Sequence, residues 1–279
     1  MKQAMAAFVR AIVLNDPATP DAPAVSSPPH ARGEDLQRRA LSALAAATAS
    51  SGKVDYARLR NSVEWSHTVE AARALQHVPL AELTGRQARL AFWINVYNAL
   101  VLHGIVELGI RRSVHQVRLF FMRVSYRIDG FRLSLDDIEH GVLRANRRRP
   151  FPPFRPFGRL DPRGALALDA VDPRIHFALH CGARSCPPAG VYRSQAIDQQ
   201  LDAATRNFVN ETVSVDDAGR VRCPKIFRWY RDDFQAGEGL VLFLLRYLDD
   251  GAVRAALAAA PARLRFTPYQ WTLAHEPVE

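Results

Sequence analysis

The chain has 279 residues, and 48% of them are hydrophobic, which is ample for a sizeable buried core. Its formal net charge is +9, but 34 of its 37 basic residues are Arg, a bias that often reflects genome composition and does not by itself predict a nucleic-acid partner. Its three cysteines are too few for the disulfide framework of a small secreted fold, so we expect a cytoplasmic protein.

The first 34 residues are predicted to form a flexible tail ahead of a single globular domain at 35–279. Residues 15–34 are rich in Pro, Ala, Ser and Asp without an apolar period, which is typical of a linker. The preceding "MKQAMAAFVRAIVL" is interrupted by Arg10 and lacks a closely following small-residue cleavage site, so it is a poor signal peptide. No apolar stretch approaches the length needed to cross a bilayer, so no transmembrane segment is expected.

The clearest helix lies in "TGRQARLAFWINVYNALVLHGIVELG", after helical stretches at about 35–51 and 55–75. Its residues 90–106 are apolar on almost every face, so we expect this helix to be central and buried. Asn95 and Asn98 are neighbours on one face, and a buried amide without partners costs about 1–3 kcal/mol. Each amide must therefore contact something specific: either loop backbone, which it would brace, or a site, which it would line.

A β-hairpin followed by a short helix is predicted in "VSYRIDGFRLSLDDIEHGVL". The Asp-Gly pair at 129–130 lies between alternating apolar residues and is a strong signal for a two-residue turn. Ser134 is placed to cap the helix. On that helix Asp136 and His140 are four residues apart and share a face, whereas Glu139 points about 100° away from His140.

The segment "RANRRRPFPPFRPFGRLDPRG", residues 144–164, combines Arg, Pro and Phe. Interleaved cations and rings are the composition of a loop that binds single-stranded nucleic acid. The density of proline favours instead an extended loop over the domain, with its Phe rings buried and its Arg side chains exposed. Since no RNA- or DNA-binding motif accompanies the loop, nucleic acid is not an expected partner, and binding to an anionic surface is the weaker alternative.

The segment "RIHFALH", residues 174–180, predicts a buried strand because it is short, apolar and followed by a glycine turn. A strand places His176 and His180 on one face and Cys181 on the other. Beyond it we expect a helix from Ser194, a hairpin in "TVSVDDAGRVRCP", three further helices and a last strand. The order of elements predicts an α+β fold, in which a helical N-terminal half around one central buried helix packs on a small mixed or antiparallel sheet with hairpins.

Four blocks of sequence follow one another along the chain: "AFWINVYNALVLHGIV", "LSLDDIEHGVLR", "DPRIHFALHCGARSCPP" and "KIFRWYRDDF". Together they resemble the family called domain of unknown function 547 (DUF547), and the resemblance runs from about Tyr56 to Leu273. It implies a fold but no established activity. "PYQWTLA" stands where the family-like sequence is "YDWSLN", so Gln270 and Ala274 replace an acid and an amide. The positions that match the family's polar residues are Asn95, Asn98, Glu139, His140, His176, Cys181 and Cys186.

The stretch "IHFALHCGARSCPP", residues 175–188, is compatible with three functions. The first is a cysteine/histidine-dependent hydrolase or acyl transferase acting on an unidentified small molecule or peptide. A thiolate nucleophile, here Cys181 or Cys186, needs a nearby imidazole and a third group that holds the imidazole. The predicted catalytic residues are Cys181, Cys186, His140, His176 and Glu139, with Asn95, Asn98, Asp136, Arg184 and Ser185 in supporting positions.

The second function is a zinc clip made by Cys181, Cys186, His140 and His176, a ligand set suited to tetrahedral zinc. Outside that alternative, no cofactor is expected. The third is a non-catalytic binding or scaffold module, in which the cysteines are small buried hydrophobes and the His and Asn side chains form a structural network. Of the three functions, only the thiol nucleophile requires its sulfur within hydrogen-bond reach of an imidazole, beside an open cleft.

Overall fold

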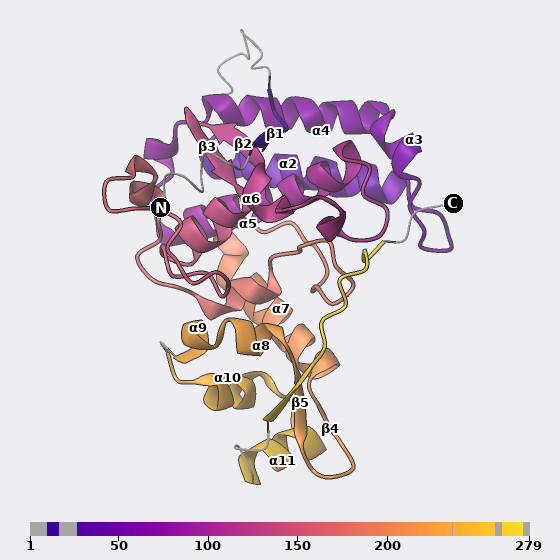
Figure 1. The fold of residues 1–279 in the computed structure, drawn as a ribbon, viewed down its shortest axis with the longest axis vertical. Helices are drawn as coiled ribbons and strands as arrows, with labels where there is room; N and C mark the ends of the chain where they lie inside the picture. The colour runs from indigo at the N-terminus through magenta and orange to yellow at the C-terminus, as the bar shows by residue number, and fades with distance from the viewer. Residues whose placement is uncertain (1–9, 17–26, 236, 260–263, 276–279) are drawn as a thin grey trace.

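Helix α5 (Arg86–Glu107) runs through the mainly helical upper part of the computed structural model in Figure 1. Helix α2 (Pro29–Ala46) packs along α5 and also against α4 (Val63–Ala74), and α3 (Tyr56–Arg60) contacts all three. The structure describes residues 10–16, 27–235, 237–259 and 264–275. Its short helical elements outside the site are η1 (Leu75–His77), η2 (Leu80–Glu82), η3 (Val114–Gln116), α6 (Phe120–Arg123), η5 (Pro162–Leu166) and η7 (Ser194–Ala196).

The central buried helix predicted from the sequence is α5. Every side chain from Leu90 to Val101 is buried. Within the described part of the chain, α5 is the one helix long and apolar enough to cross a bilayer, a length that the sequence-based expectation overlooked. However, 94% of its apolar window is buried inside the structure. Its hydrophobicity therefore serves the largest core cluster, which α5 shares with α2 and the first sheet.

The first sheet has the order β1-β2-β3. Strands β2 (Val124–Ile128) and β3 (Phe131–Ser134) form the predicted hairpin, and the positive φ angles of Asp129 (47°) and Gly130 (75°) fit its two-residue turn. Strand β1 (Ile12–Val13) pairs with β2 in parallel. The segment assigned to a flexible tail thus supplies a strand, and helix α2 begins inside that segment as well, while 1–9 and 17–26 lie outside the described residues.

The second sheet lies in the lower part of Figure 1 and has the order β4-β5-β6. Strands β4 (Ser214–Val215) and β5 (Val221–Pro224) form the second predicted hairpin, and β6 (Leu264–Thr267) pairs with β5 in parallel. The α+β class is confirmed, with two small mixed sheets. Its helices beyond the first half are α7 (Ile197–Thr212), α8 (Ile226–Trp229), α9 (Arg231–Gln235), α10 (Leu240–Tyr247) and α11 (Ala252–Ala259).

The short helix after β3 is a π-helix, η4 (Asp137–Leu143). Its predicted cap is present: Ser134 Oγ accepts a hydrogen bond from the backbone N–H of Asp137, while the Asp137 carboxylate accepts from Ser134. Gly141 leaves room for a ring, because a Cβ atom there would lie 2.4 Å from Phe157. π-Helices are rare and often occur at functional sites, so the region around η4 is a candidate functional site.

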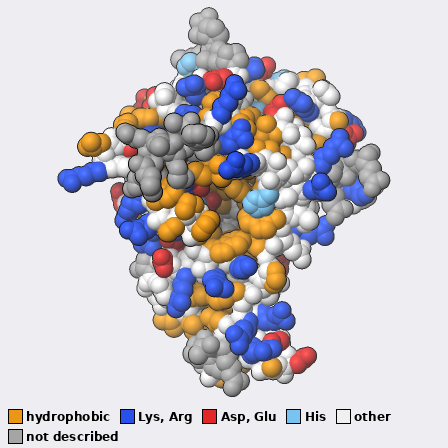
Figure 2. All heavy atoms as spheres, in the orientation of Figure 1, with side chains coloured by type: hydrophobic (Ala, Val, Ile, Leu, Met, Phe, Trp, Pro, Cys, Tyr) orange, Lys and Arg blue, Asp and Glu red, His pale blue; other side chains and the backbone are white. Residues whose placement is uncertain are grey.

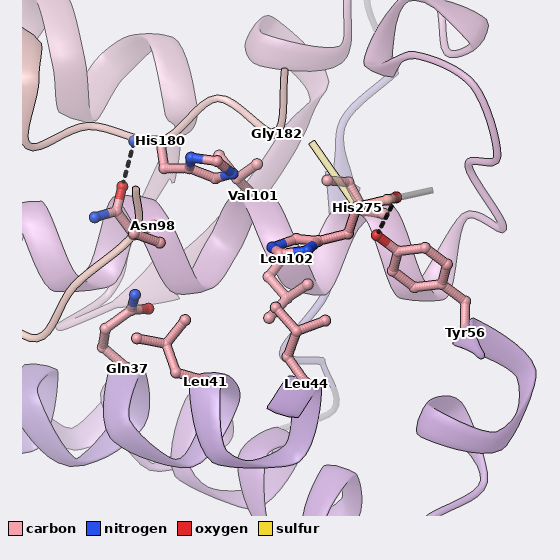
Figure 3. A pocket seen from close by; sticks show the side chains of 12 residues that line it. Gln37, Leu41, Leu44, Tyr56, Asn98, Val101, Leu102, His180, Gly182 and His275 are labelled. Carbon is pink, nitrogen blue, oxygen red and sulfur yellow. Dashed lines mark hydrogen bonds between the residues drawn. The ribbon is translucent and has the colours of Figure 1, made fainter. Parts of the chain in front are cut away.

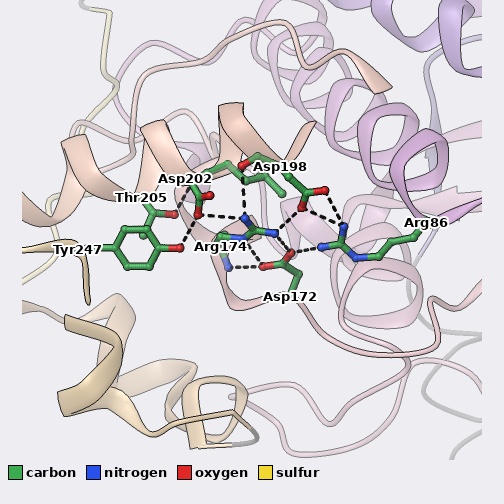
Figure 4. Close-up of polar contacts among 8 residues, drawn as sticks. Arg86, Asp172, Arg174, Asp198, Asp202, Thr205 and Tyr247 are labelled. Carbon is green, nitrogen blue, oxygen red and sulfur yellow. Dashed lines mark hydrogen bonds and ion pairs between the residues drawn. The ribbon is translucent and has the colours of Figure 1, made fainter. Parts of the chain in front are cut away.

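The predicted strand at 174–180 is wrong, because this segment begins with the 3₁₀-helix η6 (Pro173–Phe177). Asp172 caps η6 by accepting from the backbone N–H of Arg174, and Pro173 occupies the first helical position, where its missing N–H costs nothing. Arg174 also bonds the carboxylates of Asp198 and Asp202 on α7 (Figure 4). Local capping and these ion pairs fix η6 in place, and His176 and His180 consequently do not share a strand face.

Candidate functional site

A cavity of about 460 Å³ opens between the upper helical part and the segments around α8 and the C-terminus. Figure 2 shows hydrophobic side chains gathered around a hollow near the middle of one face. The titratable groups that line the cavity are Tyr97, His115, Asp136, Glu139, His140, His176, Cys181, Tyr230 and Tyr269. Its aromatic wall includes Phe121, Phe151, Trp229 and Trp271. The cavity therefore combines an apolar aromatic lining with several acid–base groups, the usual composition of a ligand site.

The titratable groups come from segments far apart in the chain. Tyr97 lies on α5, His140 on η4 and His176 on η6, while Cys181 lies on the loop that follows η6. The C-terminal segment, yellow in Figure 1, runs from β6 back to the upper part and carries Tyr269 into the cavity. Among the residues predicted to be catalytic, Glu139, His140, His176 and Cys181 thus line one cavity.

His176 is held by a buried ion-pair network. Its Nε2 lies 2.9 Å from Oδ2 of Asp233, which is only 1% exposed. The same carboxylate accepts two hydrogen bonds from Arg144, at 2.5 and 3.0 Å. Although burial opposes ionisation, the hydrogen bonds from His176 and Arg144 hold the pKa of Asp233 well below its usual range. Since an ionised carboxylate only accepts, His176 Nε2 carries the proton and Nδ1 is the basic nitrogen.

His140 is neutral in this environment. Burial lowers its pKa to about 4, against the opposing charge of Glu139. Arg144 donates to its Nδ1 at 2.9 Å, and its Nε2 lies 3.5 Å from Asp136, as the predicted shared helix face requires. Burial raises the pKa of Asp136 to about 7 despite the contact with Arg149. Both ring nitrogens of His140 are thus engaged, which makes it a poorer proton acceptor than His176.

Glu139 holds two tyrosine hydroxyls that face the cavity. Tyr230 donates to Oε1 at 2.5 Å, and Tyr97 donates to Oε2 at 3.1 Å. Burial alone would raise the pKa of Glu139, but electrostatic interactions with the His140, His176 and Arg144 side chains and the hydrogen bond from Tyr230 lower it. The ring of Tyr230 also stacks on His176, with 3.8 Å between ring centroids. Glu139 therefore positions the tyrosine that supports the His176 imidazole, and it lies 3.7 Å from His140, against the expectation that the two would point apart.

The two cysteines form a close dithiol pair with 2.8 Å between their Sγ atoms. Cys186 Sγ accepts a hydrogen bond from the backbone N–H of Cys181 at 3.1 Å, and the hydroxyl of Tyr269 lies 3.1 Å from Cys186 Sγ and 3.2 Å from Cys181 Sγ. Burial opposes the Cys186 thiolate, but hydrogen bonds from Cys181 and Tyr269 and the charge of His180 lower its pKa to about 6. The same contact with Cys186, together with burial, raises the pKa of Cys181.

The supporting amides brace loop backbone and do not line the cavity. Asn95 exchanges two hydrogen bonds with the backbone of Tyr192, at 2.7 and 2.9 Å. Asn98 donates to the carbonyl of Ala178 and accepts from the backbone N–H of His180. The two amides fasten both ends of the loop that carries Cys181 and Cys186, residues 178–193, to helix α5; we call this segment the cysteine loop. The buried polar groups of Asn95 and Asn98 are thus satisfied by structural contacts.

Arg184 and Ser185 connect the cysteine loop to the C-terminal segment. The backbone N–H of Arg184 donates to the carbonyl of Thr272 at 2.8 Å. Ser185 Oγ accepts from the backbone N–H of Gln270 at 2.9 Å. Neither residue lines the cavity. Gln270, which replaces an acid of the family-like sequence, thus contributes backbone contacts that hold its neighbour Tyr269 against the sulfurs.

His180 lies in a second, smaller hollow, which is lined by Gln37, Leu41, Tyr56 and Asn98 among others (Figure 3). Its Nδ1 lies 2.8 Å from the carbonyl oxygen of Pro187. Gly182, on the same loop, has a φ of 85°, and a Cβ atom there would lie 2.7 Å from Ile105. The loop therefore crosses α5 at a point where only glycine fits, and His180 is not among the residues that line the larger cavity.

The expected burial pattern of the 144–164 loop is wrong in part. Arg144 and Arg149 are buried, in ion pairs with Asp233 and Asp136 respectively. Phe157 is buried against η4, but Phe151 is 89% exposed at the edge of the cavity. Arg147 and Arg163 form internal ion pairs as well, so four Arg side chains of this loop are engaged within the chain, which weakens the anionic-surface alternative.

The residues that sequence reasoning missed are Arg144, Tyr230, Asp233 and Tyr269. Tyr230 and Asp233 occur in the block "KIFRWYRDDF", which carried part of the family resemblance, so a signal for them was present. Their roles depend on contacts across at least 54 positions of chain, which residue spacing does not encode. Within the described residues, no group of three or more His, Cys, Asp and Glu side chains is arranged to hold a metal ion, so the zinc clip has no support in the geometry.

Residues 80–209 match the model of one family, described as protein of unknown function, DUF547. The match covers η4, η6 and the cysteine loop, and it ends within α7. No curated protein and no solved structure matches the chain.

Proposed function

We propose, on the premise that the chain belongs to the DUF547 family through residues 80–209, that it is a cysteine-dependent hydrolase or acyl transferase. One observation carries the proposal: Cys181, with its partner thiol, shares a cavity with His176, whose far nitrogen is bound by Asp233. A thiol, an imidazole and a group that orients the imidazole are the three parts that thiol catalysis requires.

Cys181 is the nucleophile in this proposal because its side chain lines the cavity. Its proton passes to Nδ1 of His176, which lines the same cavity and whose Nε2 is bound by Asp233. Cys181 Sγ then bonds to the substrate carbonyl carbon, the bond to the leaving group breaks, and His176 Nδ1 passes the proton that it took from Cys181 to that group. Attack by water or by a second acceptor on the thioester releases the acyl group and restores the thiol.

The substrate class follows from the lining of the cavity. Trp229, Trp271 and Phe151 favour a large apolar or aromatic group beside the acyl carbon. The cavity lies open at the surface, and its volume of about 460 Å³ suits a small molecule or the side chain of a peptide. Asp136 and Glu139 place acidic groups in the same cavity, so a neutral or cationic acyl donor is favoured over an anionic one.

The test uses p-nitrophenyl acetate, a small activated acyl donor, with the full chain under reducing conditions. We expect turnover with an acetyl group on Cys181 that mass spectrometry detects after acid quenching. Cys181→Ser is expected to abolish the adduct, whereas Cys223→Ala retains it, because Cys223 is fully buried in a separate core cluster. An adduct spread over surface nucleophiles, or an undiminished rate in Cys181→Ser, would refute the proposal and leave a non-catalytic binding module.

A further inference from the structure

We propose that Cys181 and Cys186 form a reversible intramolecular disulfide, so that the cysteine loop is a redox centre. The inference rests on geometry: the two Sγ atoms are already 2.8 Å apart, and a disulfide bond of about 2.05 Å requires them to approach by only ~0.8 Å. Both cysteines are half-buried free thiols, so a small oxidant can reach them.

The closeness of the sulfurs is built into the loop. The backbone N–H of Cys186 donates to the carbonyl of Ala183, which closes a tight turn between the two cysteines. Gly182 supplies the positive φ angle of that turn, and Ala183 pairs with Leu273 of the C-terminal segment in a β-bridge. Because the hydrogen bond from Cys186 to Ala183 and the bridge from Ala183 to Leu273 hold the turn, the two thiols can bond without a rearrangement of the fold. A preformed pair of this kind has a high effective concentration, which favours closure of the ring over a mixed disulfide.

The groups around the pair also assign the order of events. Cys186 Sγ is approached by three hydrogen-bond donors, namely the backbone N–H of Cys181, the Cys181 thiol and the Tyr269 hydroxyl. These donors stabilise a thiolate on Cys186, and the thiolate is the form that attacks an oxidant. Cys181, which keeps its proton, is the resolving thiol.

The chemistry balances with a low-molecular-weight disulfide, RSSR, as the oxidant. Cys186 thiolate attacks one sulfur of RSSR, the S–S bond breaks, and RS⁻ leaves. Cys181 then loses its proton and attacks the Cys186 sulfur, which releases the second RS⁻ as the intramolecular bond forms. Two protein thiols are oxidised, one RSSR is reduced, and two RSH result after the thiolates take up the protons. A dithiol such as dithiothreitol reverses both steps.

The test counts thiols in the full chain. After incubation with oxidised glutathione, acid quenching and unfolding, we expect the three cysteines to yield one free thiol, that of Cys223. Arg184 offers a trypsin site between the paired cysteines, so peptides 175–184 and 185–193 should stay joined until reduction. Three remaining thiols, a bridge that includes Cys223 or a second chain, or a stable glutathione adduct on the native pair would each overturn the proposal.

A variant then checks the assigned order. In Cys181→Ser the glutathione adduct on Cys186 lacks its resolving thiol and should accumulate, whereas Cys223→Ala should form the bridge as the native chain does. Failure of Cys186 to take up glutathione in Cys181→Ser would overturn its assignment as the attacking thiolate. As regulation, the bridge rests on the proposed acyl transfer, which it would switch off by consuming Cys181. The thiol count needs no substrate, so the proposed disulfide and the proposed acyl transfer are tested independently of each other.

Discussion

Two kinds of buried polar side chain lie close to helix α5, and they differ in what they touch. On the helix itself, Asn98 bonds loop backbone, and His103 Nδ1 bonds the Tyr126 hydroxyl at 2.8 Å within the core. At the cavity, His176 is one of the lining residues and bonds the ionised Asp233. Burial and polarity are common to both. The difference is that His176 is paired with an ionised carboxylate beside a cavity, whereas Asn98 and His103 bond neutral groups, and this pairing is what favours chemistry over a structural role.

The most direct test of this difference replaces one histidine of each kind with Gln. His176→Gln removes the basic nitrogen from the cavity that it shares with Cys181, and it should slow p-nitrophenyl acetate turnover by about 10²–10⁴-fold, the usual contribution of a general base. His103→Gln should leave the rate unchanged and instead lower the free energy of unfolding by about 1–3 kcal/mol, because a buried hydrogen bond is lost. Equal losses of rate in both variants would remove the distinction.

The next largest effect is expected at Asp233, whose ion pairs at the candidate site also contribute to stability. Asp233→Ala leaves Arg144 buried without its partner carboxylate, and breaking a buried pair in this way costs about 3–5 kcal/mol. Urea unfolding followed by circular dichroism measures the change. Its neighbour Asp232 is exposed and serves as the matched control, since Asp232→Ala should change the free energy by less than about 0.5 kcal/mol. A cost at Asp233 no larger than at Asp232 would contradict the buried network.

Asn98 represents the buried residues with a structural role, and a smaller loss of stability is expected when it is replaced. Asn98→Ala leaves the carbonyl of Ala178 and the backbone N–H of His180 without their partner, at a cost of about 1–3 kcal/mol. Because this amide fastens the cysteine loop, the rate of thiol alkylation should change along with stability. Asn61 is an exposed amide that bonds within its own helix end, and Asn61→Ala should alter neither quantity measurably. Stability loss without any change in alkylation would show that the loop keeps its position without Asn98.

Local patterns predicted those parts of the fold whose interactions are short-range. The Asp-Gly turn, the Ser134 cap and the buried helix each depend on residues within one element, and each is present. The strand predicted around His176 is wrong because the Asp172-Pro173 pair, a helix-start signal, prevails there over the apolar pattern of the following residues. The start of helix α2 was placed late for a related reason, since Pro29 at its first turn was counted as linker composition.

The sequence predicts several residues of the site but not the contacts between them. The residues Glu139, His140, His176 and Cys181 were singled out, and they do line one cavity. What spacing could not supply is the pairing of His176 with Asp233, or of Tyr269 with the sulfurs, because these contacts join segments 57 to 88 positions apart. For the same reason Arg144 was counted with an exposed loop, although tertiary contacts bury it.

The smallest predicted effect concerns the charge on the dithiol pair. With the pKa of Cys186 lowered to about 6, the rate of alkylation by iodoacetamide should be near its plateau at pH 7 and should fall as the pH drops through 6. Tyr269→Phe removes one hydrogen bond to the thiolate, worth roughly 0.5–1.5 kcal/mol, and should therefore raise the midpoint by up to about one pH unit. Tyr56→Phe is the control, since its hydroxyl bonds the backbone of His275 and touches neither sulfur. A midpoint near that of an ordinary thiol in the native chain, or one unmoved by Tyr269→Phe, would mean that the hydrogen bonds around Cys186 do not stabilise its thiolate, and the order of attack assigned to the pair would have to be reversed.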